Sequence, residues 1–279
     1  MDVRGGSMTG FVIGILLGMG VGYWLVQWRK RIQSRKFLAV AEYWVYIPGE
    51  KLPIQDEIMK LLLQGNSPVG PAEGLLLSDI RLHIALVLRS KNPHVFRPDL
   101  FDDHLEPTAE QLQKMGESKA VVKIRYLSEE RLRTDAHLQL LPYLAYAYCK
   151  LANGNAIFDV QAERIMTVPE LQARLKEDKN ARRPDFHLNI VWKRTINGGS
   201  VETRGLVKKG IPELVTAEVH SDERLLVSGL LDEASKSLWY ADAVPTEVEI
   251  ESFNDIFRLI LGPAKDGRSE VRIMRVQVT

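Results

Sequence analysis

The stretch that decides the architecture is GFVIGILLGMGVGYWLVQW, residues 10–28, which contains no charged side chain. As an α-helix rising about 1.5 Å per residue it would be about 28 Å long, close to the hydrocarbon thickness of a bilayer. We therefore expect a single transmembrane helix at residues 10–28, with a short external tail at residues 1–9.

Basic residues indicate the orientation of this helix. Only Arg4 precedes it, whereas five follow it in a juxtamembrane segment at residues 29–36: Arg29, Lys30, Arg31, Arg35 and Lys36. Because Lys and Arg resist translocation, residues 37–279 are expected in the cytoplasm, anchored to the cell inner membrane. A cleaved signal peptide has the opposite charge order, although an A-x-A triplet at residues 39–41 keeps cleavage as the alternative.

Glycine recurs at every fourth position of the predicted helix, at Gly10, Gly14, Gly18 and Gly22. A stripe without side chains lets a second helix approach closely, so the pattern predicts a homo-oligomer formed through this face. The alternative is a slender helix with no partner.

Charge and cysteine content limit the function classes of the remaining domain. The chain has 37 Lys+Arg and 36 Asp+Glu, and the basic excess is concentrated before residue 37, so the domain is weakly acidic. It lacks the basic footprint of a nucleic-acid-binding protein, and nucleic acid is not an expected partner. Cys149 is the only cysteine, which excludes an intramolecular disulfide, and it is expected on a buried helix face.

Apolar periodicity predicts an α+β fold with a mixed, largely antiparallel sheet and packed helices. Strands are expected at residues 37–47, 80–88, 120–127, 156–159, 164–166, 186–193, 201–207, 214–219 and 270–278. Helices are expected to begin at or just after Pro53, Thr108, Asp135, Thr167, Ser221 and Ser252. Residues 66–74, rich in Pro and Gly, are expected to form a loop. The pattern leaves open one continuous sheet or two lobes, at residues 37–152 and 155–279.

Short motifs for nucleotide binding or hydrolysis are absent, so no catalytic residue and no cofactor is predicted. Weak metal-ligand candidates follow Asp99 in one acidic run: Asp102, Asp103, His104 and Glu106. Carboxylates and an imidazole can hold a divalent cation, but acidic runs before a helix commonly serve only as favourable charge at its positive end.

A corner at residues 203–214 supplies the candidate ligand-binding residues Arg204 and Glu213. Glycines and a proline between them form a rigid bend that brings the two side chains near each other. The pair is either an ion pair that braces the corner or a pair that faces a ligand.

The AIFD segment at residues 156–159, the TRGL segment at 203–206 and the GIPEL segment at 210–214 resemble features of uncharacterised bacterial domains of unknown function. The resemblance covers residues 144–219. It implies a bacterial membrane-anchored protein and carries no activity with it.

Two function hypotheses follow. The first is a membrane-anchored protein whose cytoplasmic domain binds an unknown protein or small ligand without catalysis. The second is a membrane-tethered enzyme without a short motif, which should gather its candidate residues in one concave pocket.

Overall fold

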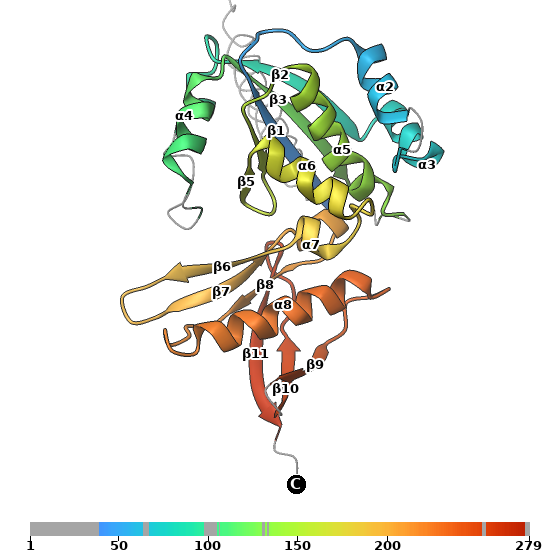
Figure 1. The fold of residues 1–279 in the computed structure, drawn as a ribbon. Helices are drawn as coiled ribbons and strands as arrows, with labels where there is room; N and C mark the ends of the chain where they lie inside the picture. Colours follow the sequence, from blue (N-terminus) through green and yellow to red (C-terminus); the bar gives the residue numbers. More distant parts are fainter. Residues whose placement is uncertain are drawn as a thin grey trace, which may run out of the picture. The chain divides into compact units, whose positions relative to one another are not determined.

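The computed structural model describes residues 39–63, 67–97, 105, 107–129, 132, 134–252 and 255–276. These residues form an α+β fold with two sheets, five-stranded and six-stranded (Figure 1). Among them, no helix has the length and apolar character that crossing a membrane requires. The predicted transmembrane helix at residues 10–28, with its four glycines, lies outside the described residues.

The first sheet has the strand order β2-β3-β1-β4-β5, and every neighbouring pair is antiparallel. Its strands are β1 (Ala39–Ile47), β2 (Leu82–Leu88), β3 (Ala120–Ser128), β4 (Ala156–Asp159) and β5 (Arg164–Met166). β1 is central because it pairs with β3 on one side and β4 on the other. Tyr43 therefore lies opposite both Ile124 and Asp159.

Helices pack on both faces of this sheet because its strands carry apolar side chains on both faces. Val45 and Ile47 of β1 face a core under α2 (Gln55–Leu63), α5 (Ala136–Leu151) and α6 (Val168–Glu177). Tyr46 points to the other face, where α4 (Ala109–Glu117) and η2 (Pro93–Phe96) contribute Met115 and Phe96.

The second sheet has the order β6-β7-β8-β11-β10-β9, and β8 and β11 form its one parallel pair among the described strands. Its strands are β6 (Asn189–Arg194), β7 (Gly199–Arg204), β8 (Glu213–Thr216), β9 (Glu247–Ser252), β10 (Asp255–Leu261) and β11 (Arg268–Val276). The long helix α8 (Arg224–Tyr240) covers one face and buries Leu230, Leu231 and Ala234 against it.

Several local predictions are confirmed. Thr167 and Glu170 form a capping box at the start of α6, and α5 begins directly after Asp135, although the Asp135 side chain makes no capping hydrogen bond. β6 and β7 form the predicted hairpin, in which Arg194 lies opposite Gly199. Cys149 is buried on α5. These features depend on residues close in the chain, and the structure places them within a few positions of the expected bounds.

The helix predicted after Ser252 is wrong, because this segment is β10. Its apolar residues fit a helical face, but they also alternate, so that Phe257 and Leu259 are buried while Ile260 is exposed. The segment is a strand because β10 forms hydrogen bonds with a neighbouring strand on each side, β9 and β11.

The loop prediction for residues 66–74 is wrong at its end, where α3 (Pro71–Leu75) begins. Pro71 occupies the first turn, where its missing N–H costs nothing, and the Glu73 carboxylate accepts the Gly70 N–H at 3.0 Å. The long helix also begins later than expected, at Arg224 rather than after Ser221.

The change between sheets also differs from the lobe boundary at residues 152–155. β4 and β5 follow this boundary in sequence but pair with the first sheet, so the second sheet starts at Asn189. The short helix α7 (Pro184–His187) leads from the first sheet into the second, and the 3₁₀ turn η5 (Leu206–Lys209), between β7 and β8, contacts β1 of the first sheet.

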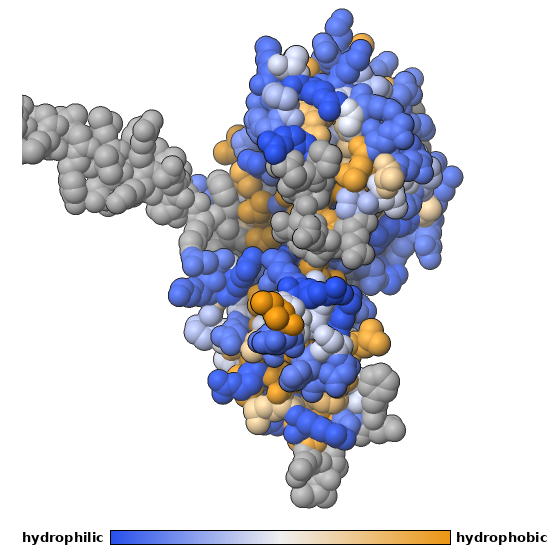
Figure 2. Space-filling model, turned by 90° about the vertical axis from the view of Figure 1, so that its left-hand side faces the viewer, coloured by the Kyte–Doolittle hydropathy of each residue, from blue (hydrophilic) through white to orange (hydrophobic). Residues whose placement is uncertain are grey.

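Polar residues cover most of the molecular face in Figure 2, and hydrophobic residues form smaller groups between them. The largest buried side chains belong instead to the cores, among them Trp239, Tyr43 and Tyr46.

Candidate ligand-binding groove

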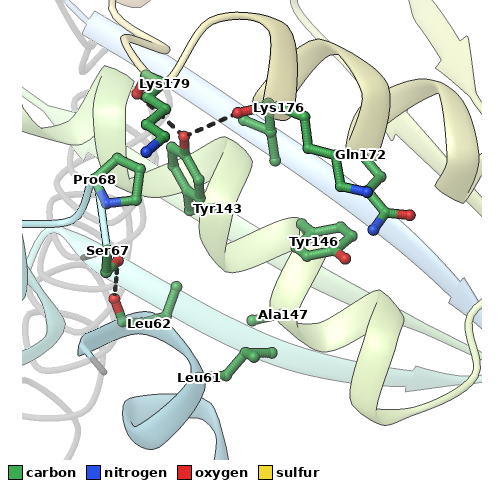
Figure 3. Close-up of a pocket in the computed structure, with 11 residues that line it drawn as sticks. Leu61, Leu62, Ser67, Pro68, Tyr143, Tyr146, Ala147, Gln172, Lys176 and Lys179 are labelled. Carbon is green, nitrogen blue, oxygen red and sulfur yellow. Dashed lines mark hydrogen bonds between the residues drawn. The ribbon is translucent and has the colours of Figure 1, made fainter. Parts of the chain in front are cut away.

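A groove of about 460 Å³ opens between α2, α5 and α6 (Figure 3). Its described lining comes from three separate stretches of sequence, residues 61–68, 143–147 and 172–179. The lining residues are Leu61 and Leu62 of α2, Ser67 and Pro68 after it, Tyr143, Tyr146 and Ala147 of α5, Gln172, Leu175 and Lys176 of α6, and Lys179 beyond α6. We call this the α2–α5–α6 groove.

Helical spacing places these side chains on facing surfaces. Tyr143 and Ala147 are one turn apart on α5, and Gln172 and Lys176 are one turn apart on α6. Ala147 is small and fully buried, so it leaves space between the two tyrosine rings and the leucines. The capping box at Thr167 sets where α6 begins and thereby which of its residues face α5.

Hydrogen bonds hold the margins of the groove. The Tyr143 hydroxyl donates to the carbonyl oxygens of Lys179, at 3.1 Å, and Leu175, at 3.5 Å (Figure 3). The buried Gln139 amide nitrogen donates to the carbonyl oxygens of Lys179, at 2.8 Å, and Pro68, at 3.3 Å. These bonds tie the segment after α6 to α5 and to the loop after α2.

The polar atoms of the groove are mainly donors and cations. Burial raises the pKa of Tyr143 to about 12 and also raises the pKa of Tyr146, so both phenols are neutral donors near pH 7. None of the described lining residues is acidic, and no ion pair within the described part of the chain engages Lys176 or Lys179. The groove therefore offers an apolar surface beside two ammonium groups.

The predicted residues Arg204 and Glu213 lie elsewhere, on β7 and β8, and both are buried. The Arg204 guanidinium pairs with the carboxylates of Glu202 and Glu163 rather than with Glu213. Arg204 and Glu202 occupy the same strand two positions apart, so they share one face of the sheet.

Glu213 instead organises the backbone of the corner. Its carboxylate accepts the Thr203 hydroxyl at 2.8 Å and the N–H groups of Gly205, at 2.8 Å, and Val207, at 3.2 Å. Burial raises its pKa. This geometry is that of a structural brace, and a role of the two residues in ligand binding stays a prediction.

Sequence reasoning missed the most deeply buried ion pair. Lys208 of η5 is fully buried, and its ammonium lies 2.5 Å from the Asp159 carboxylate and 3.3 Å from His187 Nδ1. The ring of Tyr43 lies beneath it, at 5.2 Å. We call these four residues the Lys208 cluster. A lysine between glycines is typical of exposed turns, so no local pattern indicated its burial.

The other residues considered from the sequence are the metal-ligand candidates and Cys149. The metal-ligand candidates Asp102, Asp103, His104 and Glu106 lie outside the described residues. Within the described ranges, no group of three or more His, Cys, Asp or Glu side chains could hold a metal ion. Burial raises the pKa of Cys149 to about 12, so its thiol is protonated near pH 7.

Comparison with known proteins adds no relative: no protein-family model matches this chain, and no match was found among curated proteins or solved structures. The resemblance over residues 144–219 therefore stays a prediction.

Proposed function

We propose that this chain is a single-pass protein of a bacterial inner membrane, whose cytoplasmic α+β domain binds a ligand or partner in the α2–α5–α6 groove and catalyses no reaction. The observation that carries the binding role is the groove itself, an apolar concavity of about 460 Å³ whose lining also contains a few polar side chains. Such concavities are the usual sites of ligand binding.

The anchor and its orientation rest on sequence. An uncharged stretch at residues 10–28 followed by five basic residues supports a helix with its carboxyl end in the cytoplasm. The enzyme hypothesis expects its candidate groups in one pocket. Arg204 and Glu213 are absent from the described lining of the groove, so the groove lends that hypothesis no support.

Reporter fusions test the orientation. A reporter that matures only in the periplasm, fused after Thr279, should stay inactive, and a fluorescent protein at the same place should fluoresce. The reverse pattern would contradict a cytoplasmic domain.

A matched pair of variants tests the binding role. Gln172→Trp fills the groove from α6, whereas Ala173→Trp places the same ring on the exposed neighbouring position of that helix. In a strain deleted for this protein, we expect Ala173→Trp to complement the deletion and Gln172→Trp to fail at equal protein abundance. Full complementation by both variants would contradict a function of the groove.

A further inference from the structure

We propose that the occupant of the α2–α5–α6 groove is a free long-chain carboxylate, a single acyl chain ending in an anionic group. This inference rests on the proposed function and names the chemical class of its ligand. A free amphiphile is the occupant, because a groove among three helices admits one chain and not a bilayer surface.

The apolar half of the groove fits an acyl chain. Leu61, Leu62 and Ala147 lie on one side of it, and the rings of Tyr143 and Tyr146 form the wall above them (Figure 3). The buried Leu175 adds to this surface. The volume, about 460 Å³, lies in the range of sites that enclose small ligands, on the order of 300–1,000 Å³. Covering this surface with a hydrocarbon chain removes apolar area on both partners from water.

The opposite side of the groove fits an anion. In Figure 3 the Lys179 ammonium lies beside Pro68 and Tyr143, and the Lys176 ammonium lies beside the Gln172 amide. No ion pair within the described residues engages either lysine, and the neighbouring Asp178 carboxylate pairs with Arg183. Both lysines are exposed, and a carboxylate beside either ammonium group gains an attractive charge at the edge of the apolar surface.

The same charges set the selectivity. A cationic amphiphile with an equal chain would be repelled by Lys176 and Lys179, and a neutral alcohol would gain only the hydrocarbon contacts and hydrogen bonds. Binding should therefore decrease in the order acid, alcohol, amine. Simple partition into an apolar surface produces no such order.

The test uses the full chain in nanodiscs of phosphatidylcholine with three photoactivatable probes, a sixteen-carbon acid, its alcohol and its amine, each at the same mole fraction. After irradiation, labelled peptides are mapped and quantified by mass spectrometry. We expect the acid to label peptides from α5 and α6 about tenfold more than the alcohol, and the amine to label them least.

Variants separate charge from shape. Lys176→Glu with Lys179→Glu should lower labelling by the acid about tenfold and leave labelling by the alcohol nearly unchanged. Lys150→Glu, on an exposed position of α5 outside the described lining, should change neither. Gln172→Trp should lower labelling by all three probes, because it fills the groove.

Two results would overturn the proposal, and they differ in what they mean for the function. Equal labelling of the groove by all three probes would reject an anionic ligand while leaving a binding groove. Labelling by the acid that is the same in the native chain and in Gln172→Trp would reject an acyl occupant. The complementation experiment above decides separately whether the groove functions.

Discussion

The Lys208 ammonium lies 2.5 Å from the Asp159 carboxylate, although 48 residues separate the two in sequence and neither side chain is accessible to solvent. Asp159 ends β4 of the first sheet, and Lys208 belongs to the turn between β7 and β8 of the second. His187 Nδ1 accepts a second hydrogen bond from the Lys208 ammonium group. It is free to accept because the Nε2–H of the same ring donates to the Ala181 carbonyl oxygen at 2.6 Å. This cluster joins the two sheets through charge as well as packing.

Removing one member of the pair should strongly destabilise the domain. Lys208→Met leaves the Asp159 carboxylate buried without its cation, and we expect the free energy of unfolding to fall by about 3–5 kcal/mol. Lys236→Met is the control, because Lys236 makes exposed ion pairs on α8 and should cost under about 1 kcal/mol. Urea unfolding of the full chain in mild detergent, followed by tryptophan fluorescence, measures both. Equal losses for the two variants would contradict a buried pair.

Stability should also fall in mild acid because of the buried histidines. Burial lowers the pKa of His137 to about 4 and lowers that of His187 well below its usual value. In the unfolded chain both titrate near pH 6.5, so the unfolded state binds more protons as the pH falls from about 6.5 toward the folded pKa values. Each histidine then removes up to about 1.4 kcal/mol of stability per pH unit.

A variant isolates the contribution of His137. His137→Phe keeps an aromatic ring against Tyr126, on which His137 stacks at 4.9 Å, and removes the titrating group. It also removes the hydrogen bond to the Lys208 carbonyl oxygen, so its stability at pH 7.5 should be lower. Unfolding measured between pH 5 and pH 7.5 should show a shallower pH dependence for the variant. Identical slopes would contradict a depressed pKa.

Arg204→Ala should behave as the loss of a buried brace. It leaves the Glu202 and Glu163 carboxylates without this cation on a largely desolvated face, and we expect a loss of about 3 kcal/mol or more. Arg258→Ala, which removes exposed ion pairs on β10, should cost about 0–1 kcal/mol. Glu213→Gln should lower the free energy of unfolding by about 1–3 kcal/mol. The amide NH₂ of the glutamine would face either the Thr203 hydroxyl or the Gly205 N–H, which now donate to the carboxylate. Variants that keep native stability and fail to complement would identify a ligand-facing pair instead.

Among the glycines that the structure describes, Gly205 leaves the least room for a side chain. Its φ is +103°, and a Cβ there would lie 1.9 Å from the His187 carbonyl oxygen. Gly205→Ala should therefore destabilise by about 3 kcal/mol or more, through both strain and collision. Gly116→Ala is the control, because a Cβ there meets no atom within 4 Å. Thermal melting of the two variants gives the comparison, and similar melting temperatures would contradict it.

The glycine stripe of the predicted anchor is tested separately. Changing Gly14 and Gly18 together to Ile fills the expected groove between two helices, and we expect self-association to weaken by about 1 kcal/mol or more. A membrane dimerisation assay on residues 1–36 compares the native and double-Ile segments. Equal signals would show that the glycines form no interface.

The sequence by itself determined the local elements whose causes lie within a few residues. The capping box at Thr167, the hairpin around Gly198 and the alternation of β11 follow from side chains and backbone conformations close in the chain. The same reasoning failed at β10, where apolar residues fit both periods, and only pairing with β9 and β11 decided between them.

The tertiary structure alone decided which distant residues meet. Lys208 has the local sequence of an exposed turn, and its burial follows from an acidic partner on a strand of the other sheet. The groove likewise exists only because α2, α5 and α6 pack on the same face of the first sheet. Periodicity specifies a face within one element, whereas the contact between elements depends on the packing of the whole core, which no local pattern contains.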